Sequence, residues 1–323
     1  MIDRVYDMTR VENYPFYWHD LHTSVATTYI CFLFLVIFLA FIGNILFCAT
    51  VYSSKNMRDT TTNMYLCNIS CCHIIASFLA VFTVDNILEN WKTGLFICKM
   101  TYSMIHVNNG IVSFTLLMLH LEEYIKINYL KFYQHWKISK QWKKLVAFTW
   151  IIVSLWNIPM FLFYEVHTFK SVSKSGYHQL NEQTQSCVLN MKSGRKLQNW
   201  CIIIMHLMSF VIIALLNFLI RRKLHHLSLN VANSGGLLIL LEKRKKSMKL
   251  FSVLFILHFL LGSPQVILRP ILDLDIFFIE ISQNIFLFFK FLYFTRYSLY
   301  MFVYVSLYEP CLKNVKEITI FCF

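Results

Sequence analysis

Seven long apolar stretches, separated by short polar connections, dominate the pattern of hydrophobic and polar positions along the chain. Each stretch can cross a hydrocarbon core about 30 Å thick, which needs about 20 helical residues. The pattern predicts an all-α fold, a seven-transmembrane helix bundle, followed by a short cytoplasmic C-terminal helix. The predicted spans are Ala26–Tyr52, Thr62–Val84, Gly94–Leu121, Leu145–Tyr164, Trp200–Ile220, Leu250–Leu272 and Ile285–Leu307.

The distribution of positive charge orients these spans. With the N-terminus outside, 18 of the 30 lysines and arginines fall in segments that would face the cytoplasm. Cytoplasmic loops of membrane proteins carry the excess of Lys and Arg. We therefore predict an extracellular N-terminus over residues 1–25, a transmembrane domain over 26–307 and a cytoplasmic tail over 308–323.

Composition agrees with a membrane protein and disfavours other classes. Hydrophobic residues make up 57% of the chain and charged residues 15%, whereas soluble chains carry about 25% charged residues. A net charge of +13 can indicate nucleic-acid binding, but its cytoplasmic placement suits the anionic head groups of a lipid bilayer instead. No glycine-rich phosphate loop, metal-binding histidine pair or catalytic triad is legible. The sequence thus predicts no enzyme, no metal, no cofactor and no nucleic-acid partner.

The ten cysteines do not form a disulfide framework. Most of them lie in predicted spans, where a cysteine behaves as a small apolar residue, and two lie in the predicted cytoplasmic tail, a reducing compartment. Only two look extracellular: Cys98, at the outer end of the third predicted span, and Cys187, in the outer connection after the fourth. A single outside pair predicts a single disulfide.

Several short motifs, taken with their order and spacing, resemble the rhodopsin-like G-protein-coupled receptors over essentially the whole chain. The resemblance implies a multi-pass plasma-membrane receptor with an extracellular ligand and a G-protein or arrestin partner. It also implies a signalling switch, in which Glu122-Glu123-Tyr124 stands where the family has Asp-Arg-Tyr. The other matching positions are Gly43-Asn44, Asn63–Asn68, Trp91, Trp150, Pro159, Pro264 in span six and Tyr304 at the end of the family's Asn-Pro-x-x-Tyr motif.

Departures from the family pattern put its activation mechanism in doubt. They could be drift in a diverging receptor that still signals, or they could mark a decoy or trafficking receptor that no longer couples to G proteins. Glu123 replaces the family's arginine, and His73 replaces the acid that helps to hold a sodium ion. A neutral imidazole offers no carboxylate to a hard cation. Further departures are Ser209 for a proline, Gly262 for a tryptophan and Tyr300-Met301 for Asn-Pro.

A finer resemblance, to the purinergic-receptor-like branch, suggests an anionic ligand. Arg269 stands five residues after Pro264, where many members of that branch place a ligand-binding cation. Lys290 lies near the outer end of span seven, and Tyr102 and His106 lie one turn apart on span three. We predict that these four side chains bind an anionic small molecule, lipid or peptide. Two of them also have a plain alternative role. Arg269 could reach the interface or pair with Asp273, four residues further on, and His106 could be an interior histidine.

Two further charges invite structural predictions. Glu123 should face the cytoplasmic mouth of the bundle and attract Arg221, Lys243 or Lys246. Arg296 lies deeper in span seven than Lys290, and a lipid-facing charge there would be costly. It should therefore face the bundle interior. Asn44 or backbone carbonyls are its expected partners, while His73 and His258 would be poor ones.

Overall fold

In a computed structural model of the chain, the structure describes residues 23–87, 91–136, 140–172, 181–189, 194–230, 235–273 and 283–307. Most of the predicted extracellular N-terminus lies outside the described residues. The predicted cytoplasmic tail, with its expected short helix over 308–323, also lies outside them.

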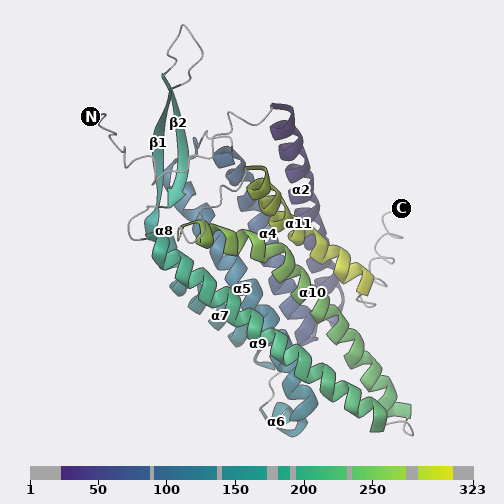
Figure 1. Cartoon of the computed structure of the whole chain (residues 1–323). Coiled ribbons are helices and arrows are strands. Elements are labelled where there is room, and N and C mark those ends of the chain that lie inside the picture. The colour runs from purple at the N-terminus through teal and green to yellow at the C-terminus, as the bar shows by residue number, and fades with distance from the viewer. Residues whose placement is uncertain are drawn as a thin grey trace, which may run out of the picture.

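The described residues form a bundle of long helices (Figure 1). Six of these helices are long and apolar enough to cross a membrane, and α11 completes the bundle as the seventh. The predicted seven-transmembrane architecture is therefore confirmed. The long helices are α2 (Thr23–Ser53), α4 (Thr61–Ile87), α5 (Gly94–Asn128), α7 (Trp142–Trp156) continued by α8 (Ile158–Phe163), α9 (Gly194–Asn230), α10 (Gly235–Asp273) and α11 (Gln283–Leu307). Short helices α3 (Lys55–Arg58) and α6 (Leu130–His135) lie in the connections.

Several helices differ in length from the predicted spans. Both α9 and α10 continue well beyond them, because hydropathy marks the part of a helix that lies in lipid, while polar residues can extend the same helix into water. The fourth span breaks at Asn157, where the Asn157 side-chain amide donates to the Val153 carbonyl at 2.8 Å. Pro159 then stands in the first turn of α8, where a missing N–H costs little.

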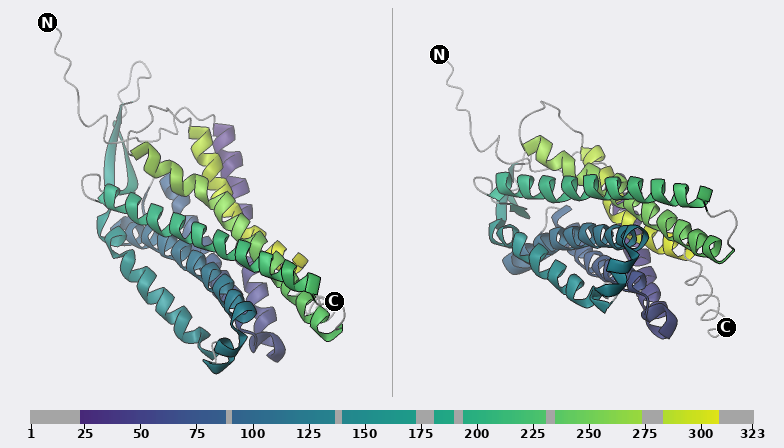
Figure 2. Two further views of the ribbon diagram at one scale, coloured as in Figure 1. Left: turned by 60° about the horizontal axis from the view of Figure 1, so that its bottom comes forward. Right: turned by 90° about the horizontal axis from the view of Figure 1, so that it is seen from below.

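The helices close into a ring. In order around the ring, α2 packs on α4, α4 on α5, α5 on α9, α9 on α10, α10 on α11, and α11 returns to α2. Helix α7 lies outside this ring against α4 and α5 (Figure 2). Large apolar side chains remain exposed on the outer surface, as a lipid environment requires. Examples are Phe32, Phe38, Phe148, Leu215, Phe218 and Leu260.

A β-hairpin, which the sequence pattern did not lead us to expect, projects from one end of the bundle (Figure 1). Strand β1 (Tyr164–Val172) pairs antiparallel with β2 (Asn181–Leu189), and Val166 lies opposite Cys187. The opposite end carries α6. The alternation of apolar and polar residues from Tyr164 to His167 was the available signal for β1.

Candidate functional site

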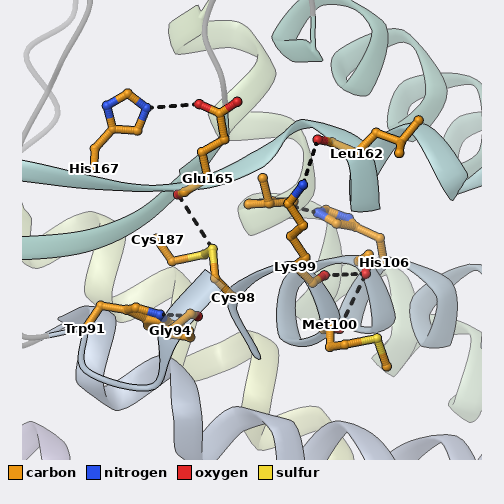
Figure 3. The surroundings of a disulfide bond; sticks show 12 residues. Trp91, Gly94, Cys98, Lys99, Met100, His106, Leu162, Glu165, His167 and Cys187 are labelled. Atoms are coloured by element: carbon orange, nitrogen blue, oxygen red, sulfur yellow. Dashed lines mark hydrogen bonds and ion pairs between the residues drawn. A yellow bond between two sulfur atoms is a disulfide. The ribbon is translucent and has the colours of Figure 1, made fainter. Parts of the chain in front are cut away.

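The hairpin is joined to the bundle by a disulfide between Cys98, in the second turn of α5, and Cys187 on β2 (Figure 3). The two Cα atoms lie 5.6 Å apart, within the range that a disulfide requires. The predicted disulfide is therefore confirmed. Both cysteines are buried together with Trp91, Met160 and Tyr164 in one apolar cluster. The disulfide thus anchors the hairpin over the ends of α5 and α8.

The segment before α5 gives the hairpin a second attachment. The Trp91 backbone N–H donates to the Gln185 carbonyl on β2 at 2.8 Å. Its indole N–H donates to the Gly94 carbonyl at 3.0 Å (Figure 3). Gly94 has φ +83°, a left-handed conformation that residues with a Cβ rarely adopt. This turn allows Trp91 to contact the hairpin just before α5 begins at Gly94.

Two of the predicted ligand-binding residues come together just below the hairpin. The ring of Tyr102 on α5 stacks on that of Tyr164, with centroids 5.0 Å apart and planes 17° apart. One turn further along α5, His106 Nε2 lies 3.4 Å from the Tyr164 hydroxyl. Tyr164 was missed because it is the last residue of the predicted fourth span. Together the three side chains form a wall of aromatic rings with polar tips.

The two predicted cations cannot both be placed. Lys290 is a half-buried side chain on α11. Arg269 belongs to α10, but its side chain lies outside the described residues, as does that of Asp273. Convergence of Arg269 and Lys290 on one pocket therefore stays a prediction.

At the opposite end of the bundle, Glu123 joins α5 to α10. Arg244 Nη1 lies 2.7 Å from Glu123 Oε1 and 3.1 Å from Oε2, and the Glu123 side chain is only 2% exposed. Arg244 lies on α10 beside two of the expected cations, Lys243 and Lys246, but it is not itself one of the three that the sequence led us to expect. Arg221 instead donates to the Asn217 side-chain oxygen at 2.8 Å. The ion pair therefore joins α5 to α10 at this end of the bundle.

The neighbouring Glu122 is held within its own region of the chain. Lys126 Nζ lies 2.6 Å from Glu122 Oε1 and 3.8 Å from Glu123 Oε2. The Tyr133 hydroxyl on α6 donates to Glu122 Oε1 at 2.9 Å. Tyr124, the third residue of the motif, is half-buried. The two acids therefore have different roles, since Glu122 fixes α6 and Glu123 reaches α10.

Of the remaining residues of the predicted switch, Tyr304 and His73 are buried in the bundle and Pro264 is half-buried. Tyr304 is fully buried, and its ring centroid lies 4.3 Å from that of Phe47 on α2. Helix α10 continues through Pro264. His73 on α4 lies against Tyr297 and Tyr300, with ring centroids 4.9 and 4.5 Å away.

Arg296 faces the bundle interior, as its cost in lipid predicted, and is 1% exposed. Its Nη2 donates to the Asn109 side-chain oxygen on α5 at 2.7 Å, and its Nη1 donates to the His258 carbonyl on α10 at 3.3 Å. Asn44, one of the two expected alternatives, is not among these partners, and its side-chain N–H group donates to the carbonyls of Ala40 and Tyr297. The carbonyl partner was correct in kind. Arg296 thus ties α11 to α5 and α10.

This arrangement explains the glycine that replaces the family's tryptophan in span six. A Cβ built on Gly262 would lie 2.2 Å from Arg296 Nη1, well inside van der Waals contact. The guanidinium therefore occupies the space beside α10 that a side chain at position 262 would need. The missing side chain at Gly262 and the position of the Arg296 guanidinium are therefore two halves of one structural feature.

The described part of the chain contains no group of three or more His, Cys, Asp or Glu side chains placed to hold a metal ion. The polar chemistry of the bundle is instead that of hydrogen bonds, aromatic contacts and ion pairs between helices.

Comparison with known proteins identifies the family. Residues 43–308 match the family described as "7 transmembrane receptor (rhodopsin family)". This chain belongs to that family. Its members are receptors and not enzymes. The seven transmembrane segments of the family agree with the long apolar helices of this receptor.

Individual relatives are more distant. The receptor is 26% identical over 179 residues to "Cholecystokinin receptor" of Xenopus laevis, covering 54% of this chain and 38% of that protein. It is 29% identical over 145 residues to "Probable G-protein coupled receptor 19" of Mus musculus, covering 44% and 34%. It is 26% identical over 167 residues to "QRFP-like peptide receptor" of Branchiostoma floridae, covering 47% and 41%. The matched segments thus span less than half the length of these curated relatives.

Proposed function

We propose that this receptor lies in the plasma membrane, binds an anionic extracellular ligand beneath the β-hairpin, and signals to a G protein from the opposite end. The single observation that carries the site is the contact of Tyr102 and His106 with Tyr164, directly under a hairpin held by the Cys98–Cys187 disulfide. A disulfide forms in an oxidising compartment, which supports an extracellular position for this end. The same orientation leaves residue 308 onward in the cytoplasm.

The anionic character of the ligand rests on the cations of α10 and α11. Lys290 is a half-buried amine on α11, and Arg269 lies near the C-terminal end of the preceding helix α10. A carboxylate or phosphate would gain charge-assisted hydrogen bonds from both, and arginine can bind such a group in a bidentate manner. Small acids, acidic lipids and acidic peptides share this chemistry, and one relative bears the name of a peptide receptor.

We further propose membership of the purinergic-receptor-like branch. Support comes from Arg269 five residues after Pro264, and from Cys98-Lys99, Met104 and His106, which are similar to the orphan called probable G-protein coupled receptor 141. The branch assignment predicts that acidic ligands with a phosphate or carboxylate will activate the receptor.

A screen of acidic ligands against cells that express the receptor tests the site. Once a ligand that activates the receptor is found, Arg269→Lys should weaken the potency of that ligand even though the charge is kept, because the bidentate contact is lost. Arg269→Ala and Lys290→Ala should weaken it further, by about tenfold or more, as expected for a hydrogen bond to a charged group. The measurement is the concentration for half-maximal signalling.

Lys99→Ala is the matched control for that screen. Lys99 is a cation near the start of α5, on the same helix as Tyr102 and His106. Its Nζ donates to the Leu162 carbonyl and lies over the Phe161 ring on α8. Its loss should leave potency unchanged. Equal potency of the wild type and Arg269→Ala would reject the anion site, while a response to neutral ligands alone would reject the anionic class.

The alternative function, a decoy or trafficking receptor that does not couple, is favoured by a specific observation. Glu123 occupies the position of the family's arginine and is bound to Arg244. This ion pair holds α5 to α10 at the inner end, whereas opening of that end would expose the surface for a G protein. A decoy would keep this contact under all conditions.

Glu123→Gln separates the two functions. If the receptor couples, removal of one charge of the Glu123–Arg244 pair should raise basal signalling several-fold above a low wild-type level. The measurement is basal G-protein activation in cells at matched surface expression. Glu242→Gln is the control, because Glu242 pairs with Lys245 on the exposed side of the same helix. High basal activity that Glu123→Gln leaves unchanged would contradict the ion-pair account, and no activity in Glu123→Gln or Glu123→Arg would favour the decoy.

A further inference from the structure

Arg296 is a buried positive charge whose described surroundings are neutral. Its hydrogen-bond partners are the Asn109 amide oxygen, the His258 carbonyl and the Tyr297 hydroxyl. Its guanidinium also lies over the rings of Tyr293 and Tyr297, at 4.1 and 5.1 Å from the centroids. No carboxylate among the described residues forms an ion pair with it. A buried charge is costly unless an opposite charge compensates it.

Several buried polar atoms around this charge have no hydrogen-bond partner. Arg296 Nε, which can only donate, has no partner. Both ring nitrogens of His73 are also without partners, although His73 is 1% exposed. On α10, the His258 Nδ1 is unpartnered while its Nε2 lies 2.9 Å from the Ser113 hydroxyl. The great majority of buried polar atoms in proteins have a hydrogen-bond partner. This concentration therefore calls for a further species, and Arg296 Nε requires that the species accept a hydrogen bond.

These groups belong to one region of the bundle. The Tyr297 ring contacts both the Arg296 guanidinium, at 5.1 Å, and the His73 ring, at 4.9 Å. The His258 carbonyl accepts a hydrogen bond from Arg296 Nη1 at 3.3 Å, so His258 also borders this charge. Water would satisfy the donors but would leave the charge uncompensated. An anion would do both.

We propose that a small monovalent anion binds in the bundle core beside Arg296, with the N–H of a neutral His73 as a second donor. This site lies deeper in the bundle than the proposed ligand site, because Asn109 lies three residues beyond His106 on α5, about 4.5 Å further along the helix axis. It therefore goes beyond the function proposed above and needs no extracellular ligand. An anion here would hold α4 and α11 together while α10 keeps its glycine contact with Arg296.

Chloride is the probe for this site. The full chain, purified in detergent, is unfolded by heat in sodium chloride or in sodium gluconate at the same concentration, since gluconate is too large for a packed core. An anion that binds only the folded protein raises the unfolding midpoint in a saturable way. We expect a higher midpoint in chloride, which increases with chloride concentration and then levels off. Equal midpoints in the two salts at every concentration would overturn the proposal.

Variants locate the effect. Arg296→Gln should abolish the chloride-dependent shift, and His73→Phe, which keeps a ring against Tyr297 but removes the N–H, should raise the chloride concentration for half-maximal shift about tenfold. Arg58→Gln is the control, because Arg58 is an exposed arginine on α3, and its shift should equal that of the wild type. The same shift in Arg296→Gln as in the wild type would also overturn the proposal.

Crystals of the wild type grown in bromide give a readout that does not depend on any variant. We expect an anomalous peak within hydrogen-bond distance of Arg296. Diffraction data of adequate quality without such a peak would overturn the proposal, even if Arg296→Gln cannot be purified.

Discussion

Cys187→Ser should lower the free energy of unfolding by about 2–4 kcal/mol and remove most of the receptor from the cell surface. The disulfide links positions 89 residues apart, so its loss releases a long loop of the unfolded chain. It also frees β2 from α5, and Tyr164 loses the support that holds it against Tyr102. Flow cytometry of an N-terminally tagged receptor measures the surface level, and thermal unfolding of purified protein measures the stability.

Two controls make this result specific. Cys31→Ser changes an exposed free cysteine on α2 and should leave both measurements unchanged. The double variant Cys98→Ser/Cys187→Ser should be no worse than Cys187→Ser, because both lack the same bond. Wild-type stability in Cys187→Ser would show that the hairpin is held by other contacts, such as the Trp91–Gln185 hydrogen bond.

Gly262→Leu should destabilise the receptor by about 1–3 kcal/mol through overpacking. A glycine in a helix costs about 1 kcal/mol relative to alanine, so a substitution at an open site would be stabilising. Here the first added carbon would already meet Arg296 Nη1 at 2.2 Å. The end of an arginine can often move aside, but this one is buried and bonded to Asn109 and the His258 carbonyl. The clash should therefore outweigh the gain in helix propensity.

Truncation of the arginine tests that explanation. In the background Arg296→Ala, the space beside Gly262 becomes available, and Gly262→Leu should cost much less than in the wild type. The measurement is a double-mutant cycle of thermal unfolding, with an expected coupling of about 0.5–3 kcal/mol. Additive effects of the two substitutions would mean that Gly262 is required for another reason.

The amino-acid sequence by itself determined the seven spans and the disulfide. A bilayer demands about 20 apolar residues for each crossing, so hydropathy alone marks the long helices α2, α4, α5, α7 with α8, α9, α10 and α11. Only Cys98 and Cys187 lie at the predicted extracellular face, and this was enough to pair them. The same logic predicted that Arg296 faces the interior, because lipid would be a costly alternative.

Which side chains meet was decided by the tertiary structure. Successive residues of a helix point about 100° apart, so among the four adjacent cations at 243–246 the sequence could not single out Arg244 as the partner of Glu123. The Arg296–Gly262 contact joins helices whose rotation no hydropathy pattern defines. The hairpin was missed because its few alternating residues follow directly on an apolar span. Apolar periodicity determines what lies in the membrane, whereas the axial rotation and depth of each helix, set by packing, determine the chemistry at its centre.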